Sequence, residues 1–151
     1  MQQVAVRRLE REDLQDLLAL YRDLHPHDPA LPPDLARQRF AEMTAMPALS
    51  ILGGFVGDNL AGSCVLVVMP NLTRGGRPHA LIENVVTARV FRRMGVGRAV
   101  LAHAVDLALQ ENCYAVRLMT GSSSPATHSF YAGCGFRPTK QGYEIRDIPA
   151  R

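Results

Sequence analysis

The chain has 151 residues, of which 47% are hydrophobic and 21% charged, a composition typical of one globular domain spanning residues 1–151. Seventeen Lys and Arg against fourteen Asp and Glu leave a formal net charge of +3, which suits a small anionic ligand but is too slight to indicate a nucleic-acid scaffold. No apolar run approaches the roughly 18 residues of a membrane helix, no apolar core of signal-peptide length follows the first residue, and the three cysteines form no CxxC motif. These features argue against a membrane protein, a secreted disulfide scaffold, a structural zinc site and a repeat array, and they favour the cytoplasm.

The first third of the chain predicts one strand and two helices. Residues 4–9 alternate between apolar and polar, as in a strand. Acidic residues then open a helix whose leucines recur at helical spacing until His25-Pro26. A loop with four prolines follows over residues 25–33, and Asp34 is a plausible cap for a second helix that ends at Met46-Pro47.

The rest of the chain predicts a β-rich middle followed by alternating helices and strands. The turn sequence Gly57-Asp58-Asn59 joins two strand-like runs into a hairpin. The expected elements are strands over 49–56, 60–69, 80–87 and 114–120, helices over 96–112 and 126–132, and a closing strand over 143–148. The order β-α-α-β-β-β-α-β-α-β predicts an α/β (α+β) fold with a mixed, mostly antiparallel sheet and helices on both faces.

The most informative segment is a strand, Leu81–Thr87, that leads into a glycine- and arginine-rich turn and then a long helix. Amides at a helix N-terminus lack partners within the helix, and the helix dipole there favours an anion. Gly95 and Gly97 allow close approach of a phosphate to the backbone, and Arg92, Arg93 and Arg98 add positive charge. The segment therefore predicts a pyrophosphate site, with a simple capped helix bearing solvated arginines as the alternative.

Two familiar nucleotide motifs do not fit this turn. A P-loop needs Lys followed by Ser or Thr after its last glycine, where this chain has Arg98-Ala99. A dinucleotide fingerprint needs a third small residue, where Val100 stands, and an acidic residue about 20 positions later, a region that holds Tyr114 to Leu118.

Two signatures instead resemble the GNAT family of N-acetyltransferases. Arg92-x-x-Gly95-x-Gly97 is similar to the family motif that cradles the pyrophosphate of acetyl-CoA, and Phe130-Tyr131-x-x-x-Gly135-Phe136 resembles its C-terminal motif. Both stand in the family's order and at its usual separation, and the resemblance covers essentially the whole chain. Ile82–Val86 and Asn112–Tyr114 look most like the glucosamine-6-phosphate N-acetyltransferase branch, which usually has Glu-Asp where this chain has Glu83-Asn84.

The resemblance implies how acetyl-CoA is held. The strand at residues 85–87 splays from its neighbour, so its backbone pairs with the pantetheine arm and one N–H polarises the acetyl carbonyl. Ser124 falls where relatives carry a polar contact to CoA. The implied cofactor-binding residues are Val85, Val86, Thr87, Arg92, Arg93, Met94, Gly95, Val96, Gly97, Arg98 and Ser124.

Amine acetylation also needs a base for the amine and an acid for the departing thiolate. Glu83 interrupts an apolar strand, where Glu is disfavoured, so we expect it to be the general base, acting through a water or directly; a salt-bridged or edge Glu is the alternative. Asn84 should point to the opposite face unless a bulge intervenes. Tyr131 is the family's usual general acid, and the alternative is a ring packed under the sheet. We interpret His128, one helical turn earlier, as a surface histidine.

The sequence gives weaker support for two other kinds of site, a cysteine nucleophile and a metal site. Cys134 has no identifiable activating base for an acyl-cysteine mechanism. His25-Pro26-His27-Asp28 offers too few clustered ligands for a metal site, so no metal is expected. We interpret this segment as part of a lid that faces the acceptor. The residues expected to contact the acceptor are Tyr21, His25, His27, Asn84 and the loop over 70–78.

The leading hypothesis is an acetyl-CoA-dependent N-acetyltransferase that transfers acetyl directly to a small primary amine, either an aminosugar or an amino-acid derivative. Transfer of a larger acyl group, acetylation of protein lysines or N-termini, and a silent CoA-binding sensor remain alternatives. We expect no nucleic-acid or membrane partner, and the resemblance makes a homodimer possible.

Overall fold

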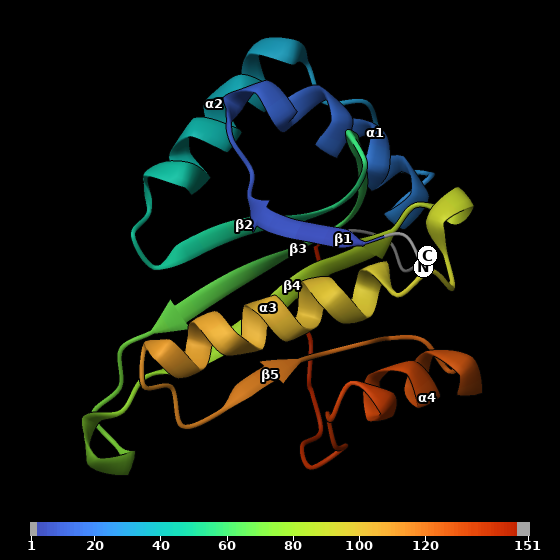
Figure 1. Ribbon diagram of the computed structural model, residues 1–151. Helices are drawn as coiled ribbons and strands as arrows, with labels where there is room; N and C mark the ends of the chain where they lie inside the picture. The colour runs from blue at the N-terminus through green and yellow to red at the C-terminus, as the bar shows by residue number, and fades with distance from the viewer. Residues whose placement is uncertain (1–2, 148–151) are drawn as a thin grey trace. The chain divides into compact units, whose positions relative to one another are not determined.

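The computed structural model describes residues 3–147, and the chain divides into two compact units, Met1–Leu118 and Met119–Arg151. The expectation of one domain over 1–151 stays a prediction. Figure 1 shows the elements, which are β1 (Val4–Arg8), η1 (Arg11–Asp13), α1 (Leu14–Leu24), α2 (Pro33–Ala45), β2 (Leu49–Val56), β3 (Asn59–Met69), η2 (Arg74–Gly76), β4 (His79–Thr87), η3 (Arg89–Phe91), α3 (Val96–Gln110) and β5 (Val116–Leu118) in the first unit and α4 (Pro125–Gly133) in the second. None of the helices in the described part of the chain is long and apolar enough to cross a membrane.

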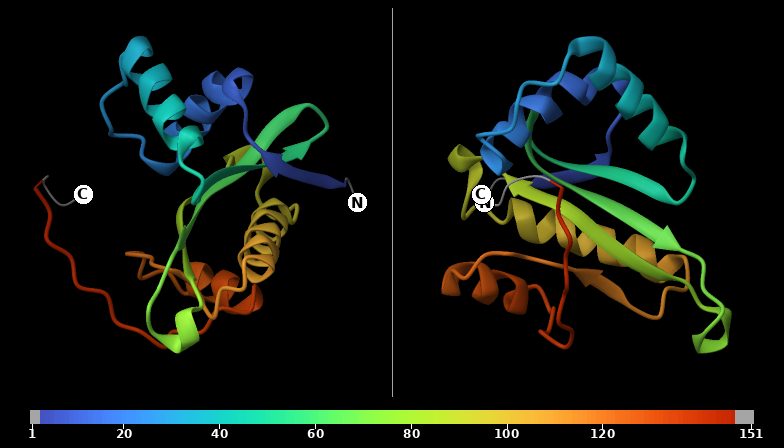
Figure 2. Two further views of the ribbon diagram at one scale, coloured as in Figure 1. Left: turned by 90° about the vertical axis from the view of Figure 1, so that its left-hand side faces the viewer. Right: turned by 180° about the vertical axis from the view of Figure 1, so that it is seen from behind.

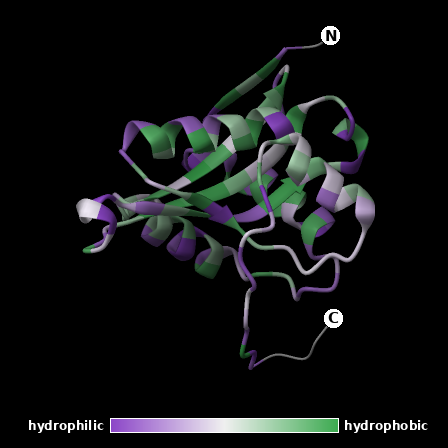
Figure 3. Ribbon diagram, turned by 90° about the horizontal axis from the view of Figure 1, so that it is seen from below, coloured by the Kyte–Doolittle hydropathy of each residue, from purple (hydrophilic) through white to green (hydrophobic). Residues whose placement is uncertain are grey.

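The first unit is built on a five-stranded sheet in the order β1-β2-β3-β4-β5. The first three pairings are antiparallel and β4 pairs with β5 in parallel, so the predicted mixed, mostly antiparallel sheet is confirmed. The parallel pair follows from α3, which carries the chain back along the sheet between β4 and β5. In Figure 3 the strands are largely hydrophobic, as expected for a sheet that is covered by helices.

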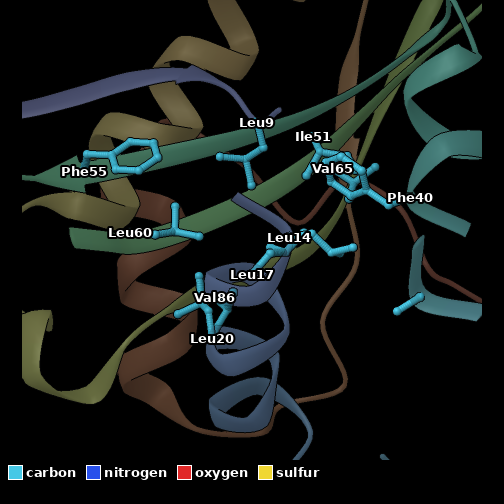
Figure 4. Close-up of a cluster of buried hydrophobic side chains, with 11 residues drawn as sticks. Leu9, Leu14, Leu17, Leu20, Phe40, Ile51, Phe55, Leu60, Val65 and Val86 are labelled. Atoms are coloured by element: carbon cyan, nitrogen blue, oxygen red, sulfur yellow. The ribbon is translucent and has the colours of Figure 1, made fainter. Parts of the chain in front are cut away.

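Helices α1 and α2 cover one face of this sheet (Figure 2). Figure 4 shows Leu14, Leu17 and Leu20 of α1 directed toward strand residues that include Leu60 and Val86. These side chains are less than a tenth exposed, and burial of each contributes on the order of 1.5–3 kcal/mol relative to exposure. The cluster therefore fixes α1 over β3 and β4.

Helix α3 covers the opposite face. Its buried residues are Val96, Val100, Leu101, Ala104 and Ala108. Gly54 and Gly62 allow it to approach closely, because a Cβ on Gly54 would lie 2.6 Å from Val100 and one on Gly62 would lie 2.7 Å from Val96. The start of α3 is therefore held against β3, beside the end of β4.

Two predictions about element ends are wrong. Asp34 does not cap α2, because the helix begins at Pro33 and Asp34 lies within its first turn; the fixed φ of proline suits the first helical position. Residues 143–147 form no strand, and Tyr143 and Ile145 are 91% and 102% exposed. Alternation alone does not make a strand where no apolar face is buried. Residue 148, the last of that predicted strand, lies outside the described residues.

Candidate functional site

A bulge in β4 shapes the centre of the candidate site. Val65 of β3 pairs with Glu83 and Ser63 pairs with Val86, so two residues of β4 stand opposite Cys64. Asn84, the first of these two, has a left-handed backbone with φ of +51°, which asparagine tolerates better than most residues. The bulge breaks the alternation of side chains along the strand.

Both polar residues at the bulge are exposed, and they share one face of the sheet. Glu83 stands opposite Val65, which belongs to the cluster under α1 and α2. Asn84 approaches the hydroxyl of Tyr21, which lies on α1. Strict alternation would have sent Asn84 to the other face, and the bulge is the exception to alternation that the sequence analysis allowed. Among the described residues, no basic side chain forms an ion pair with Glu83.

The pairing of β4 with β5 covers only the first part of β4, because β5 is three residues long. Their ladder joins Ala80–Ile82 to Val116–Leu118 and stops before Glu83. The side chain of Val86 is buried against α1, so any ligand along the β5 side of this segment would meet mainly backbone. An extended arm with amide groups can bind such an edge as an added strand does.

The turn before α3 has the geometry of an anion site. Gly95 is the N-cap of the helix with φ of +81°, and Arg93 is also left-handed with φ of +65°. A Cβ placed on Gly95 would meet nothing within 4 Å, so the turn is open. The first backbone bond of the helix is donated by Ala99 to the carbonyl of Gly95, at 3.0 Å. The N–H groups of residues 94–97 donate no hydrogen bond to any part of the chain that the structure describes.

Positive charge surrounds this turn. Arg92, Arg93 and Arg98 are all exposed, and Nε of Arg92 donates to the carbonyl of Thr87 at the end of β4, at 3.4 Å. The helix dipole adds a partial positive charge at the same end. The arrangement can therefore hold a diphosphate beside the end of β4.

A contact that the sequence analysis missed joins α1 to this region. The carboxylate of Asp23 accepts a hydrogen bond from the backbone N–H of Arg89, at 3.0 Å, and lies 3.9 Å from Nε of the same residue. An acidic residue in the last turn of a helix is disfavoured by the helix dipole. That mismatch is a signal that Asp23 has a partner outside its helix, although the sequence does not reveal which one.

The remaining residues expected at the acceptor side lie around the end of α1. His25 caps the helix, with its N–H donated to the carbonyl of Tyr21 at 2.9 Å, and His27 is exposed in the loop that follows. Within the described part of the chain, no three His, Cys, Asp or Glu side chains gather as a metal site would require.

The second unit holds the other predicted residues. Ser124 is the N-cap of α4, and its carbonyl accepts from the N–H of Thr127 at 3.1 Å. Tyr131 is half-buried, with its ring 5.3 Å from that of Phe130 and 6.4 Å from that of Phe136. The glycine of the second signature, Gly135, has φ of +91° and turns the chain after α4.

Two further residues that the sequence analysis considered, His128 and Cys134, lie in the same unit as Tyr131. His128 is exposed, and its Nε2 lies 2.8 Å from the carbonyl of Ser122, to which it donates. Its ring is therefore held by the loop before α4, as expected for a surface histidine. Cys134 is partly exposed, and its N–H contacts the carbonyls of Phe130 and Tyr131, each at 3.1 Å.

A hollow of about 440 Å³ lies elsewhere in the first unit. Its lining includes Arg8, Ser50, Leu66 and Glu111. It adjoins the carboxyl end of α3, whereas the open turn precedes the amino end of the same helix. We therefore do not assign it to the diphosphate site.

Comparison with known proteins finds relatives among the acetyltransferases. A glucosamine 6-phosphate N-acetyltransferase of Trypanosoma brucei brucei is 30% identical over 132 residues, which cover 87% of this chain and 88% of that protein. A solved structure from Agrobacterium tumefaciens C58, described as a candidate acetyltransferase, is 43% identical with a TM-score of 0.92, covering 95% of this chain and 99% of the other.

An aminoglycoside N-acetyltransferase solved in complex with CoA has a TM-score of 0.80 over 96% of this chain and 95% of its own. At 16% identity this similarity shows the fold alone. The model of the acetyltransferase (GNAT) family matches residues 14–136, a range that includes the bulge, the open turn and α4. This protein is therefore an acyltransferase that belongs to the acetyltransferase (GNAT) family.

Proposed function

We propose that this protein is an acetyl-CoA-dependent N-acetyltransferase that transfers acetyl directly to the primary amine of a small molecule, either an aminosugar or an amino-acid derivative. The observation that carries the proposal is the turn before α3, with its unpaired N–H groups and surrounding arginines. The name of the trypanosomal relative supports an amine acceptor, and CoA in the complex with the same fold supports the cofactor.

The pyrophosphate is bound by the turn of residues 92–98. The N–H groups of Met94, Gly95, Val96 and Gly97 donate to its oxygens, and the three arginines balance its charge. Ser124 supplies a further polar contact to CoA. The backbone of Val85, Val86 and Thr87 pairs with the pantetheine arm, which is consistent with a β4–β5 ladder that ends at Ile82.

The chemistry needs a base and an acid. When bound, acetyl-CoA supplies an activated acetyl group on a thioester. Glu83 accepts the proton that the amine loses as its nitrogen bonds to the carbonyl carbon, either directly or through a water. A backbone N–H near the bulge stabilises the negative charge that develops on the carbonyl oxygen. Tyr131 donates its proton to the sulfur as the C–S bond breaks, which leaves free CoA and an N-acetylated product.

The acceptor is contacted by Tyr21, His25, His27 and Asn84. The position of Tyr21 and Asn84 on the same face of the sheet as Glu83 supports this assignment. The family resemblance also makes a homodimer possible, which light scattering of the purified protein tests, and the three cysteines without a CxxC motif favour the cytoplasm.

A pair of glycine variants tests the proposal. Gly95→Ala and Gly57→Ala each add a methyl group to open backbone with a positive φ, so both should lose a similar 1–2 kcal/mol of folding stability. Only Gly95→Ala fills space at the diphosphate site. We expect it to weaken acetyl-CoA binding about tenfold by calorimetry, whereas Gly57→Ala binds as wild type.

With acetyl-CoA as the donor, the wild-type protein should form free CoA thiol in the presence of some amines of a panel that includes aminosugar phosphates. Equal affinity for acetyl-CoA in the two glycine variants would remove the turn from the site. Tight binding without thiol release for any amine would instead indicate a silent CoA-binding protein.

A further inference from the structure

The hydroxyl of Tyr21 is a buried polar group without a hydrogen bond. Its oxygen is excluded from solvent and lies near the amide of Asn84, but no described residue makes a hydrogen bond of normal geometry with it. Buried polar groups are nearly always satisfied, because an unpaired one costs free energy comparable to a lost hydrogen bond. Ser63 Oγ and His79 Nδ1 are also buried without a partner, but among these three atoms the hydroxyl of Tyr21 is the one that adjoins Asn84 in the candidate site.

Burial is the main influence on this hydroxyl. Burial raises the pKa of Tyr21 to about 12, and the nearby amide of Asn84 lowers it by a smaller amount. The phenol is therefore neutral at physiological pH, with one proton to donate and lone pairs to accept. Its nearest polar neighbour, Asn84, is also neutral and can both donate and accept.

The placement of the two groups favours recognition of a ligand next to the reacting amine. Asn84 is adjacent to Glu83 in the bulge and is exposed, and its amide lies near the hydroxyl of Tyr21 on α1. Because the hydroxyl of Tyr21 is excluded from solvent, a ligand group reaches it only after neighbouring side chains change rotamer, and such changes are common on binding. A carboxylate here would lose its hydration without a countercharge and would repel Glu83.

We propose that Tyr21 and Asn84 form a specificity site that hydrogen-bonds an uncharged hydroxyl group on the carbon next to the acceptor amine. The inference rests on the proposed function and narrows its acceptor to amino alcohols. A hydroxyl matches the pair because it donates one hydrogen bond and accepts others, as the phenol and the amide both require. An amine without that hydroxyl would leave the buried phenol unsatisfied in the complex.

The test compares 2-aminocyclohexanol with cyclohexylamine, which differ only in the neighbouring hydroxyl. For the wild type we expect kcat/KM, measured by thiol release, to be at least about tenfold higher for the amino alcohol. Tyr21→Phe should bring this ratio close to one and leave the KM for acetyl-CoA unchanged. Tyr114→Phe is the matched control and should keep the wild-type ratio, since that hydroxyl contacts Arg117 at the opposite end of β4.

Thermal unfolding separates this role from a structural one. Tyr21→Phe removes an unpaired polar atom and keeps the ring, so its melting temperature should equal or exceed that of the wild type. A wild type without preference, or a Tyr21→Phe variant that keeps it, would overturn the inference while the proposed function stands. Absence of thiol release with every amine by a protein that binds acetyl-CoA would overturn the proposed function and this inference together.

Discussion

One left-handed residue decides which face of the sheet carries the polar side chains. Without the bulge, the side chains of Glu83 and Asn84 would point to opposite faces of the sheet, because side chains alternate along a strand. With the bulge, both residues share the face that α1 covers, and Tyr21 joins them from the helix. The sequence predicts Glu83 as unusual because it interrupts apolar residues. It does not predict Tyr21 as a partner of Asn84, because that contact depends on the packing of a helix 60 residues away.

The acid and the base of the proposed mechanism should be separable by pH. Glu83→Gln should lower kcat/KM for the amine about 100-fold at neutral pH. The loss should shrink at alkaline pH, where the free amine needs no base.

Tyr131→Phe should lower turnover with little change in acetyl-CoA binding, because the hydroxyl of Tyr131 acts on the departing thiolate. Both effects are measured by thiol release across pH.

The matched control is Glu111→Gln, which neutralises an exposed carboxylate at the end of α3. It should leave the pH–rate profile unchanged. An unaltered profile in Glu83→Gln would remove Glu83 as the base, and wild-type turnover in Tyr131→Phe would remove Tyr131 as the acid.

At the scale of elements, local signals predict most of the structure. The hairpin of β2 and β3 agrees within a residue, because glycine and asparagine favour its tight turn. One prediction that fails is the closing strand, because residues 143–147 form none and Tyr143 and Ile145 are exposed. Alternation identifies a strand only when a neighbouring edge and an apolar surface exist, and both depend on distant parts of the chain.

Contacts between elements cannot be predicted from the sequence pattern. One of them, an ion pair, can be tested by varying the pH. Arg7 of β1 donates to both carboxylate oxygens of Asp13, at 2.7 and 2.8 Å, and Asp13 also accepts from the N–H of Glu10, at 2.7 Å. The hydrogen bond from Arg7 holds the pKa of Asp13 below its usual range. This ion pair joins the first strand to the start of α1 and so helps to hold the helix that carries Tyr21.

Asp13→Asn should destabilise the fold by about 1–2 kcal/mol at pH 7. A carboxylate whose folded pKa is lowered stabilises the protein above its unfolded pKa of about 3.9, and this contribution is lost as pH falls through the folded value. The two proteins should therefore converge in acid, as measured by urea unfolding between pH 7 and pH 3. Asp34→Asn, which removes an exposed ion pair with Arg37, should change stability by less than about 0.5 kcal/mol. A constant difference between wild type and Asp13→Asn at all pH values would contradict this account.

At the scale of the whole molecule, the two signatures bracket a long stretch of chain, from the turn at residues 92–98 to the segment after α4. Their order predicts the family, because each signature encodes a local backbone shape, Gly95 in the first and Gly135 in the second. The contacts that position the turn come from residues far away in the sequence. Gly62 allows α3 to pack closely against β3, and Asp23 accepts a hydrogen bond from Arg89, which lies before the turn. Such support arises from packing and has no pattern along the sequence.

Ligand binding at this turn should stabilise the folded protein as a whole. A ligand that binds only the folded state at 100 times its Kd adds about 2.7 kcal/mol, which corresponds to a rise of about 5–10 °C in Tm for a chain of this length. We expect acetyl-CoA and CoA to give such a rise in a thermal-shift assay. Pantetheine, which lacks the pyrophosphate, should give almost none at the same concentration. High salt should reduce the rise, since it screens the exposed arginines from the diphosphate. An equal shift with pantetheine would mean that the arm, and not the turn before α3, supplies the binding free energy.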